Sequence, residues 1–468
     1  MKIKSIIKIL FFLGIFFIPF NSTEISTLLG EYRYESAIFF LLLAFAFIII
    51  YYYLSQKIIF PYKNKIYSII LLFIFWCLIS FIFNFFEIKD FYYKQTSGIE
   101  RFIKQYISIL LACVICFNVY WFALRDKTPK EILFLIRKIF SFSLLFVSFY
   151  GLIELLIAYF NLTFLMPVFE LFNYLPFIET HIHNGGRISS VSQEPPFLAI
   201  YLITIASWMF SYILTSKSKY RFIPTIVVLL LTFFSGSRAA LAVVGIQTVF
   251  FTYYLYFHFG YKLLIIKCIK YISIISIAFM VILGAKFYDA ISEKISSLNL
   301  LGNLETSISN KTRLGMQYTS LLVFSENPIT GVGFGQQAFV AKDKYPTWAT
   351  KNNYEFEMFY LNQNVKSFPP SFNLYTRLLA ELGIIGFLIF VYFEIKVILT
   401  LRLLIKNETD FYRKTLGITL LISFAGLFIN WLQIDSFRVY GVWLFLAILL
   451  IYMKFYEQNN SINSTLQQ

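Results

Sequence analysis

Twelve runs of apolar residues divide this 468-residue chain. A helix needs about 20 apolar residues to cross the hydrocarbon core of a bilayer. Because that core offers the backbone no hydrogen-bonding partner, such segments fold as helices that satisfy their own peptide groups. The sequence therefore predicts an all-α polytopic membrane bundle, with spans at about 5–20, 36–55, 66–86, 102–123, 139–160, 195–215, 222–236, 239–257, 271–286, 374–396, 415–433 and 439–455.

The composition excludes the main soluble alternatives. Hydrophobic residues make up 59% of the chain and charged residues only 14%, whereas a soluble domain carries about 25% charged residues. The net charge of +15 would suggest a nucleic-acid partner in a soluble chain. Here the basic residues form short groups between apolar runs, as membrane topology requires, and we expect no nucleic-acid partner. Cys113 and Cys116 have the spacing of a redox or metal pair, but their apolar neighbours predict two buried residues instead.

The basic groups also orient the chain. With Met1 in the cytoplasm, the groups within 125–138, 217–221 and 402–414 fall on the inner side, in agreement with the positive-inside rule. Both termini are then predicted to be cytoplasmic. The first run follows three lysines, as in a signal peptide, but no small-residue cleavage site follows it. We expect it to remain as the first helix.

Two long outer loops, 161–194 and 287–372, are predicted by this topology. Connections of such length are usually functional or disordered. The second loop is rich in glycine, aromatic residues and proline, and we expect it to be partly folded. In it, Asn310 is expected to cap a helix from Lys311 to about Ser325. The apolar face of that helix, expected to lie on the membrane or on the bundle, comprises Leu314, Tyr318, Leu321 and Leu322.

Polar residues inside or beside the spans concentrate in the outer half of the predicted bundle. An ionisable residue within a span is costly and marks a candidate functional site. Asn373, Arg377 and Glu381 are four residues apart and lie on one helix face. We expect them to bind substrate; alternatively, Arg377 and Glu381 form an ion pair that joins helices. The other members of this layer are Glu154, Glu194, Arg238, Asn430, Gln433, Asp435 and Arg438.

Two outer segments carry candidate chemistry. Ser235-Gly236-Ser237-Arg238 joins two spans through a tight turn, which places Arg238 at a helix N-terminus where backbone N–H groups and a guanidinium favour phosphate. The alternative is an interfacial arginine that only reaches for water. In the 161–194 loop, Gly185-Gly186-Arg187 gives the backbone freedom beside an arginine.

Three residues of the 161–194 loop are candidates for a general base. Pro195 suits the first turn of the next helix, so Glu194 stands at that helix's N-terminus. His181 and His183 lie just upstream, and histidine is the most frequent general base near neutral pH. Alternatively, Glu194 is only an acidic cap of the helix, and His181 and His183 are only surface histidines of the loop.

A glycine-rich segment, 331–335, has the form of a nucleotide-binding loop but lacks the preceding strand and βαβ unit. A compact turn is the better interpretation. No His, Cys and acidic residues share a metal-ligand spacing, so we expect neither a metal nor a cofactor.

These segments, in this order, resemble the O-antigen polymerase and ligase family. The likeness covers residues 222–400. We expect the whole chain, 1–468, to form a single membrane domain. Its Arg187-to-Pro195 segment is more similar to the polymerase branch. The resemblance rests on Ser237-Arg238-Ala239, Asn327-Pro328, Gly331-Val332-Gly333, Ser371-Phe372-Asn373-Leu374-Tyr375 and Glu381-Leu382-Gly383.

The resemblance implies transfer of a glycan from undecaprenyl diphosphate on the outer side of the bacterial inner membrane. Arg187, Arg238 and Arg313 would bind the diphosphate or glycan phosphate. Positioned arginines stabilise a leaving diphosphate without a metal. Expected partners are the undecaprenyl-diphosphate-linked oligosaccharide and membrane lipid, with a chain-length regulator and a flippase as further candidates.

Ligases resembling this family have a histidine two residues before the position aligned with Leu374, where this chain has Phe372. That departure favours a polysaccharide polymerase that builds O-antigen or capsule from repeat units. The alternatives are an O-antigen ligase and a flippase for the same lipid-linked unit. A flippase has no need of so large an outer loop and would place its cationic residues along a central cavity.

Overall fold

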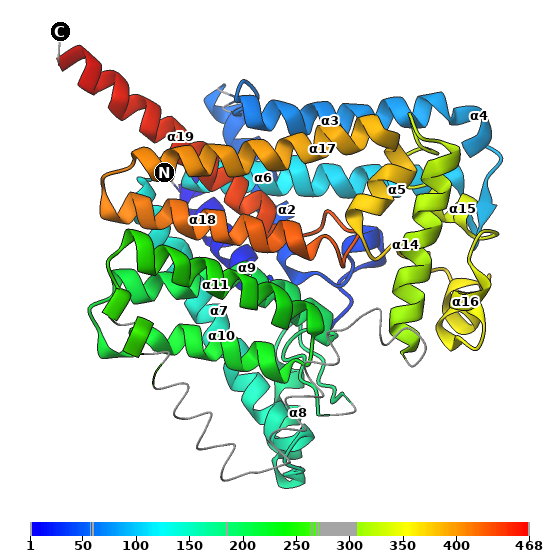
Figure 1. Cartoon of the computed structure of the whole chain (residues 1–468), viewed down its shortest axis with the longest axis horizontal. Coiled ribbons are helices and arrows are strands. Elements are labelled where there is room, and N and C mark those ends of the chain that lie inside the picture. Colours follow the sequence, from blue (N-terminus) through cyan, green and yellow to red (C-terminus); the bar gives the residue numbers. More distant parts are fainter. Residues whose placement is uncertain are drawn as a thin grey trace.

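The long helices run roughly side by side as one bundle (Figure 1). The computed structural model describes residues 2–56, 58, 60–183, 186–263, 265–267, 270 and 307–466. In these ranges the only sheet is one short antiparallel hairpin, in which Tyr92 pairs with Ser97 and Tyr93 with Thr96. The predicted all-α polytopic membrane fold is confirmed.

Along the chain, the helices of the bundle alternate with connecting segments that contain shorter helices, a hairpin and the 19-residue helix α14. The bundle contains α1 (Lys2–Phe16), α2 (Ser36–Ser55), α3 (Lys65–Phe83), α5 (Gly98–Leu110), η2 (Leu111–Cys116), α6 (Phe117–Leu124), α7 (Pro129–Ala158), α9 (Pro195–Thr215), α10 (Ile223–Phe234), α11 (Arg238–His258), α17 (Leu374–Asn407), α18 (Phe411–Asn430) and α19 (Tyr440–Leu466). The connecting pieces are η1 (Thr27–Tyr32), α4 (Phe85–Ile88), β1 (Tyr92–Tyr93), β2 (Thr96–Ser97), η3 (Thr163–Leu165), α8 (Met166–Glu170), η4 (Leu171–Tyr174), η5 (Lys219–Phe222), α14 (Ile308–Glu326), α15 (Gln337–Ala341), α16 (Thr347–Thr350) and η6 (Phe356–Tyr360).

Nine helices of the described ranges are long and apolar enough to cross a membrane, and each matches a predicted span. One of them, Gly98–Leu124, runs without a break through α5, the π-helical η2 and α6. The predictions at 5–20 and 222–236 correspond to shorter helices, since α1 has 15 residues and α10 has 12. The prediction at 271–286 lies outside the described residues. Cys113 and Cys116 are buried and free, as predicted.

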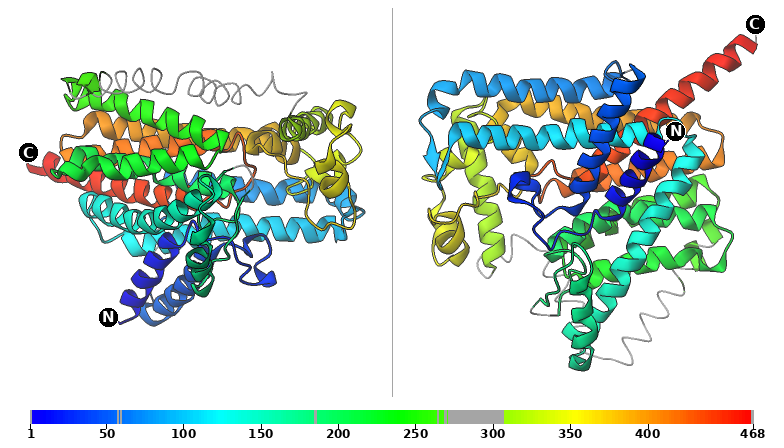
Figure 2. Two further views of the ribbon diagram at one scale, coloured as in Figure 1. Left: turned by 90° about the horizontal axis from the view of Figure 1, so that it is seen from below. Right: turned by 180° about the vertical axis from the view of Figure 1, so that it is seen from behind.

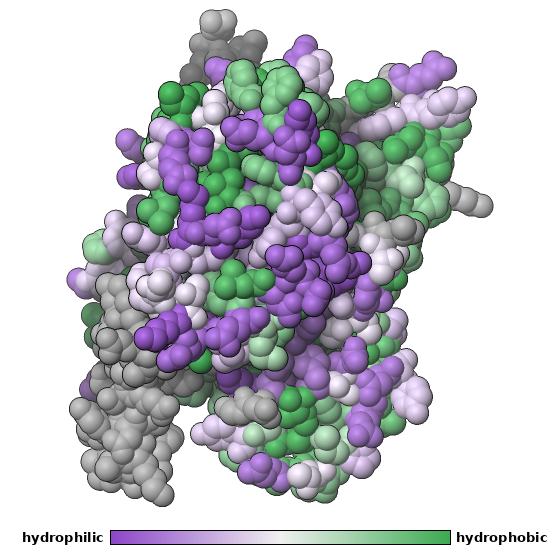
Figure 3. Space-filling view, turned by 90° about the vertical axis from the view of Figure 1, so that its right-hand side faces the viewer, coloured by the Kyte–Doolittle hydropathy of each residue, from purple (hydrophilic) through white to green (hydrophobic). Residues whose placement is uncertain are grey.

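Both termini lie at one end of the bundle, and α4, the hairpin and α14–α16 lie at the opposite end (Figures 1 and 2). Viewed from the side that carries α14–α16, hydrophilic side chains gather across the middle of the surface, with hydrophobic patches above and below them (Figure 3). The flanks of the bundle instead expose large apolar side chains such as Leu145, Phe149 and Val249. This division is expected of helices whose sides face lipid and whose ends face water.

The helix α14 begins and packs differently from the sequence prediction. Its N-cap is Ser307, whose side chain accepts a hydrogen bond from the N–H of Asn310, so the predicted cap at Asn310 is wrong. The helix packs through small residues: a Cβ on Gly315 would lie 2.4 Å from the Cβ of Ala349. Tyr318 and Leu321, from the predicted apolar face, stay exposed. These two side chains therefore do not pack on the bundle, and their contact with the membrane stays a prediction.

A break near the start of α17 pairs this helix with the compact turn predicted from the glycine-rich segment. At Gly383 the backbone adopts φ +64° and ψ −169°. The Val332 N–H donates to the Ala380 carbonyl at 3.0 Å, and the Ile384 N–H donates to the Pro328 carbonyl at 2.8 Å. Backbone groups freed by the break therefore find partners in the turn.

Glycine is required on both sides of this contact. A Cβ on Gly383 would lie 2.2 Å from the carbonyl oxygen of Ile329. A Cβ on Gly331 would lie 2.3 Å from the carbonyl carbon of Glu381. Both glycines have positive φ, a conformation that other L residues adopt at a cost. These two motifs of the family resemblance are thus two halves of one backbone contact.

We predict that Gly383→Ala destabilises the protein, by roughly 1–3 kcal/mol from backbone strain and further through the clash with Ile329. Thermal unfolding of the purified protein in detergent measures the loss. Gly245→Ala in α11 is the matched control, because a Cβ there meets no atom within 4 Å. Equal unfolding temperatures for the two variants would contradict this account.

Candidate functional site

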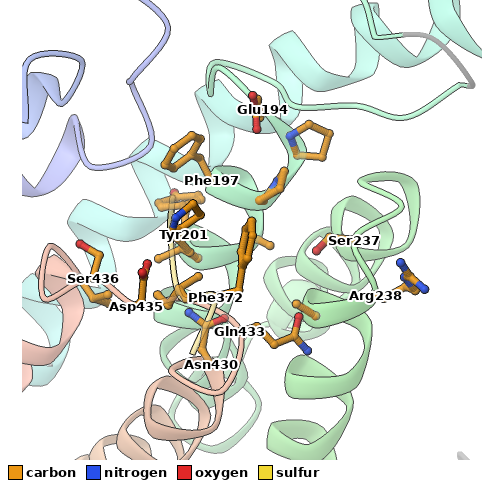
Figure 4. Close-up of a pocket in the computed structure, with 18 of the residues that line it drawn as sticks. Glu194, Phe197, Tyr201, Ser237, Arg238, Phe372, Asn430, Gln433, Asp435 and Ser436 are labelled. Carbon is orange, nitrogen blue, oxygen red and sulfur yellow. The ribbon is translucent and has the colours of Figure 1, made fainter. Parts of the chain in front are cut away.

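A cavity of about 980 Å³ lies where α9, α11, α14 and α19 meet the loops before α9, α17 and α19 (Figure 4). Five of the nine predicted site residues line it: His183, Arg187, Glu194, Arg238 and Arg313. The other lining residues used below are Ala199, Ile200, Ala242, Phe372, Asp435, Ser436, Arg438, Val439, Tyr440 and Glu35.

Two loop motifs that are separate in sequence meet at this cavity. Ser237 caps α11, so Arg238 is the first residue of that helix. Gly236, at φ +61°, lies directly against Arg187, and a Cβ there would be 2.9 Å from the Arg187 Nε. The Arg187 Nε donates to the Ser235 carbonyl at 3.3 Å. The tight turn therefore holds one arginine and begins the helix that carries the other.

The three arginines predicted to bind phosphate share the cavity. Burial lowers the pKa of Arg187 and of Arg313, and in each case the charge of Arg238 lowers the pKa further. A bound anion would lower the electrostatic repulsion between these like charges. Arg313 also lies over the Phe372 ring, 5.0 Å from its centre. Among the described residues, no carboxylate forms an ion pair with Arg187 or Arg313.

A buried carboxylate anchors the loop that carries Arg187. Glu154, on α7, is fully buried. Its Oε1 accepts the Ser189 N–H at 3.0 Å, and its Oε2 accepts the Ser190 N–H at 2.7 Å. Ser190 has a positive φ of 53°, so the strained turn is held by two hydrogen bonds from backbone N–H groups to the buried side-chain oxygens of Glu154. Glu154 therefore positions Arg187 indirectly, by holding the backbone of the loop that carries it.

The two predicted histidines form a pair of which one reaches the cavity. Their ring centres are 4.8 Å apart. His181 lies behind, with Nε2 3.1 Å from the Ser189 Oγ and Nδ1 3.1 Å from the Glu179 carbonyl oxygen. Burial, and next the neighbouring His181, lower the pKa of His183. A lowered pKa keeps this imidazole neutral, which is the form that accepts a proton.

Glu194 stands at the start of α9, at the edge of the cavity. It is the N-cap residue of the helix, but its side chain makes no capping hydrogen bond. Figure 4 places it next to Phe197, apart from Gln433 and Asn430 at the far side of the cavity. Its carboxylate is exposed, so it is accessible to a ligand rather than committed to the helix.

Asn373, Arg377 and Glu381 do not line the cavity. Asn373 caps α17, its Oδ1 accepting two backbone N–H groups of the first turn. Arg377 and Glu381 form a buried ion pair with 3.1 Å between Nε and Oε1. Arg377 also donates to the Asp435 carbonyl at 2.7 Å, and Asp435 lines the cavity. In the structure these three residues thus lie behind the cavity wall.

Arg438, in the loop between α18 and α19, is the centre of a second, partly buried ionic cluster. Its Nη1 is 2.8 Å from the Oε1 of Glu35, and its Nη2 is 3.6 Å from the Oε2 of Glu31. Arg101 binds Glu31 at 2.9 Å from the other side. Burial opposes the charged form of Glu31, but the charges of Arg101, Arg438 and Arg377 lower its pKa to about 2. The loop that walls the cavity is therefore tied to the first loop of the chain.

Three lining residues carry little signal in the sequence. Asp435, whose Oδ2 accepts the Ser371 N–H at 2.6 Å, is marked only by its place in the outer polar layer. Phe372 is marked only by its departure from ligases. Glu35 follows a short helix far from the other motifs, and no pattern in the sequence connects it with them.

We predict that Glu154→Gln loosens the Arg187 loop, because one amide N–H group would then face a backbone N–H. A buried donor left without its acceptor costs about 1–3 kcal/mol. The measurement is the rate of limited trypsin cleavage after Arg187, which should rise. Glu170→Gln, on the exposed side of the same loop, is the control. Unchanged cleavage in Glu154→Gln would show that the carboxylate does not hold the loop.

Residues 223–391 match the family model described as O-antigen ligase. No curated protein matches the chain. The matched segment contains the Arg238 turn, α14 and the paired glycine motifs of α17. Within the described ranges, no three His, Cys, Asp or Glu side chains are grouped as metal ligands.

Proposed function

We propose that the chain is a polysaccharide polymerase, on the basis of the match of residues 223–391 to the O-antigen ligase family model and of the make-up of the cavity. Members of this family transfer lipid-linked glycans. In this proposal the chain joins undecaprenyl-diphosphate-linked repeat units into O-antigen or capsular polysaccharide on the extracytoplasmic side of the inner membrane.

The observation that carries the proposal is the make-up of the cavity. Three arginines share it with an apolar wall that includes Ile200, Ala242 and Val439. A lipid diphosphate needs both surfaces: apolar side chains for the first units of its lipid and cations for the diphosphate. As the glycosidic bond to the diphosphate breaks, negative charge grows on the leaving oxygen. Pre-positioned guanidinium groups stabilise that charge in the transition state more than in the ground state.

The acceptor sugar hydroxyl must also lose a proton. Glu194 at the edge of the cavity and neutral His183 within it are candidates for this base. His181 would act through His183 and Ser189 rather than on substrate. Asn373, Arg377 and Glu381 would support the substrate site by holding the Asp435 loop.

Polymerase is preferred to ligase because Phe372 occupies the place of the histidine found in ligases resembling this family. This side chain lines the cavity and packs under Arg313, where it can orient the cation but cannot accept a proton. An O-antigen ligase remains the second candidate, supported by the description of the matching family model.

The proposal places both termini in the cytoplasm and α14–α16 outside, so that the cavity opens toward flipped, lipid-linked substrate. A chain-length regulator and a flippase are proposed partners.

We predict that Arg238→Ala lowers transfer by about 10²–10³-fold while the protein remains in the membrane at normal level. Arg238→Lys should restore little, because a lysine lacks the planar fork of donors. The readout is the surface-glycan ladder, with immunoblotting of the membrane fraction. Arg402→Ala, at an exposed position of α17, is the control; it shows whether loss of an arginine outside the cavity also lowers transfer. A full ladder from Arg238→Ala would remove this residue from the site.

The function itself is tested by a surface-glycan gel of a strain lacking the gene and of the same strain complemented. Collapse of the ladder to core plus one repeat supports the polymerase. A polymer that persists on its lipid carrier but never reaches a final acceptor supports the ligase. Loss of even the single repeat supports the flippase.

A further inference from the structure

The first part of the 161–194 loop exposes apolar side chains where the sequence predicts a loop in water. It consists of the consecutive helical turns η3, α8 and η4, from Thr163 to Tyr174, and Glu170 is its only charged residue. A cluster of exposed apolar side chains outside the spans marks an interaction surface. The exposed apolar side chains of this segment, from 46% exposed at Val168 to 88% at Tyr174, are Phe164, Val168, Leu171 and Tyr174.

The inner face of segment 163–174 is apolar as well. Phe169 and Phe172 are buried, and their ring centres lie 5.0 Å and 4.8 Å from that of Tyr150 on α7. A helical segment that is apolar on all sides belongs either in a protein core or in a membrane. Because its outer face is exposed, the protein core accounts for only one of the two faces.

The outer face of the segment is continuous with the lipid-facing flank of α7. Leu145, Phe149 and Leu152 are exposed and lie four and three residues apart, so they form one stripe along that helix. The stripe meets the segment at Phe149, whose ring centre is 6.1 Å from that of Phe172. Since α7 is long and apolar enough to cross a membrane, the apolar side chains exposed on it face acyl chains, and the same lipid reaches the segment.

The direction in which the segment projects agrees with a place in lipid. In Figure 1 and in the right-hand view of Figure 2, α8 projects sideways from the bundle past α10, and it does not extend beyond the end that carries α14–α16. The membrane surrounds the sides of such a bundle, whereas water meets its ends. The helical turns of the segment also pair backbone groups within the segment itself, as a lipid environment requires.

We propose that segment 163–174 is a membrane anchor, which lies in the leaflet nearer to α14–α16 with its exposed apolar side chains among the acyl chains. Tyr174 and Glu170 place their polar groups at the level of the lipid head groups, where tyrosine is enriched. Lipid rather than a second protein covers the segment, because it already covers the adjoining stripe of α7. The anchor keeps the loop that continues to Arg187 at head-group depth, and the inference does not rest on the proposed transfer function.

The test attaches an NBD fluorophore to Tyr174→Cys in the full-length chain. Cys268→Ser is added, and the free cysteines of the described residues are buried and therefore protected from the label. The protein is placed in nanodiscs, one copy in each, and quenching is measured with nitroxide-labelled phosphatidylcholine, which acts from lipid, and with iodide, which acts from water. The lipid should quench this label as strongly as one on Leu145→Cys, and iodide should quench neither. A label on Lys351→Cys, exposed beside α16, should show the reverse.

A second variant tests whether the apolar side chains hold the segment in the lipid. Phe164→Glu combined with Leu171→Glu puts two charges on the outer face, and charges among acyl chains are costly. The label at Tyr174→Cys should then lose most of its quenching by lipid and become accessible to iodide. Thr163→Glu, at an exposed polar position of the same segment, is the matched control and should leave the quenching unchanged. Thermal unfolding in detergent checks that both variants remain folded.

Three results would overturn the proposal. Quenching of the Tyr174→Cys label by iodide alone would place the segment in water. Quenching by neither agent would show that protein covers it. Unchanged quenching by lipid in the folded variant with two glutamates would show that Phe164 and Leu171 do not anchor the segment. None of these measurements depends on transfer activity, so failure of the anchor and failure of the proposed function are distinguishable.

Discussion

Charged groups set into the end of an apolar bundle must be paired, because moving an isolated ion into a low-dielectric interior costs several kcal/mol. Most of the buried and partly buried arginines described above obey this constraint. Arg377 is paired with Glu381, and Arg438 and Arg101 are joined through Glu31. Hydrogen bonds from Arg377 to the Gln105 side chain and to the Asp435 carbonyl then connect α17 with α5 and with the loop before α19 in one frame. That frame forms the wall on which the cavity depends.

At the cavity, two arginines lack such an ion pair with any carboxylate of the described residues. Arg187 and Arg313 lie close enough to Arg238 for its charge to lower their pKa values, and the ion pairs described for this chain do not include either of the first two. Neighbouring cations are kept together by the rest of the structure: Glu154 fastens the Arg187 loop, and α14 is fixed against α16. The charges of Glu194 and Glu355 oppose this repulsion at Arg187 and Arg313 respectively, and in our proposal the lipid diphosphate supplies further negative charge.

Much of the fold follows from the sequence, because membrane spans are written in continuous apolar runs. Residues 222–236 are apolar enough to be predicted as a span, but α10 has only 12 residues and ends before the Gly236 turn. The cap of α14 was misplaced because Ser307 and Asn310 are both good cap residues, and its packing face depends on Ala349, which belongs to another segment.

The site was less predictable. Arginines beside glycines were recognisable, since a positive φ and a close contact leave a trace in residue type. No local pattern in the sequence could show that Gly236 makes room for Arg187. Nor could it show that Glu381 pairs with Arg377 and does not line the cavity, whereas Asp435 does. Glu35 reaches the cavity from the first loop of the chain. Contacts between segments hundreds of residues apart appear only when the chain is folded.

The central claim is that this chain joins lipid-linked repeats in the arginine-lined cavity. The most direct measurement incubates the purified chain in lipid nanodiscs with one purified lipid-linked repeat and follows the products by mass spectrometry. The account predicts lipid-linked dimers and longer chains, together with free undecaprenyl diphosphate in equal number to the bonds formed. A repeat that remains single, with no undecaprenyl diphosphate released, would contradict it.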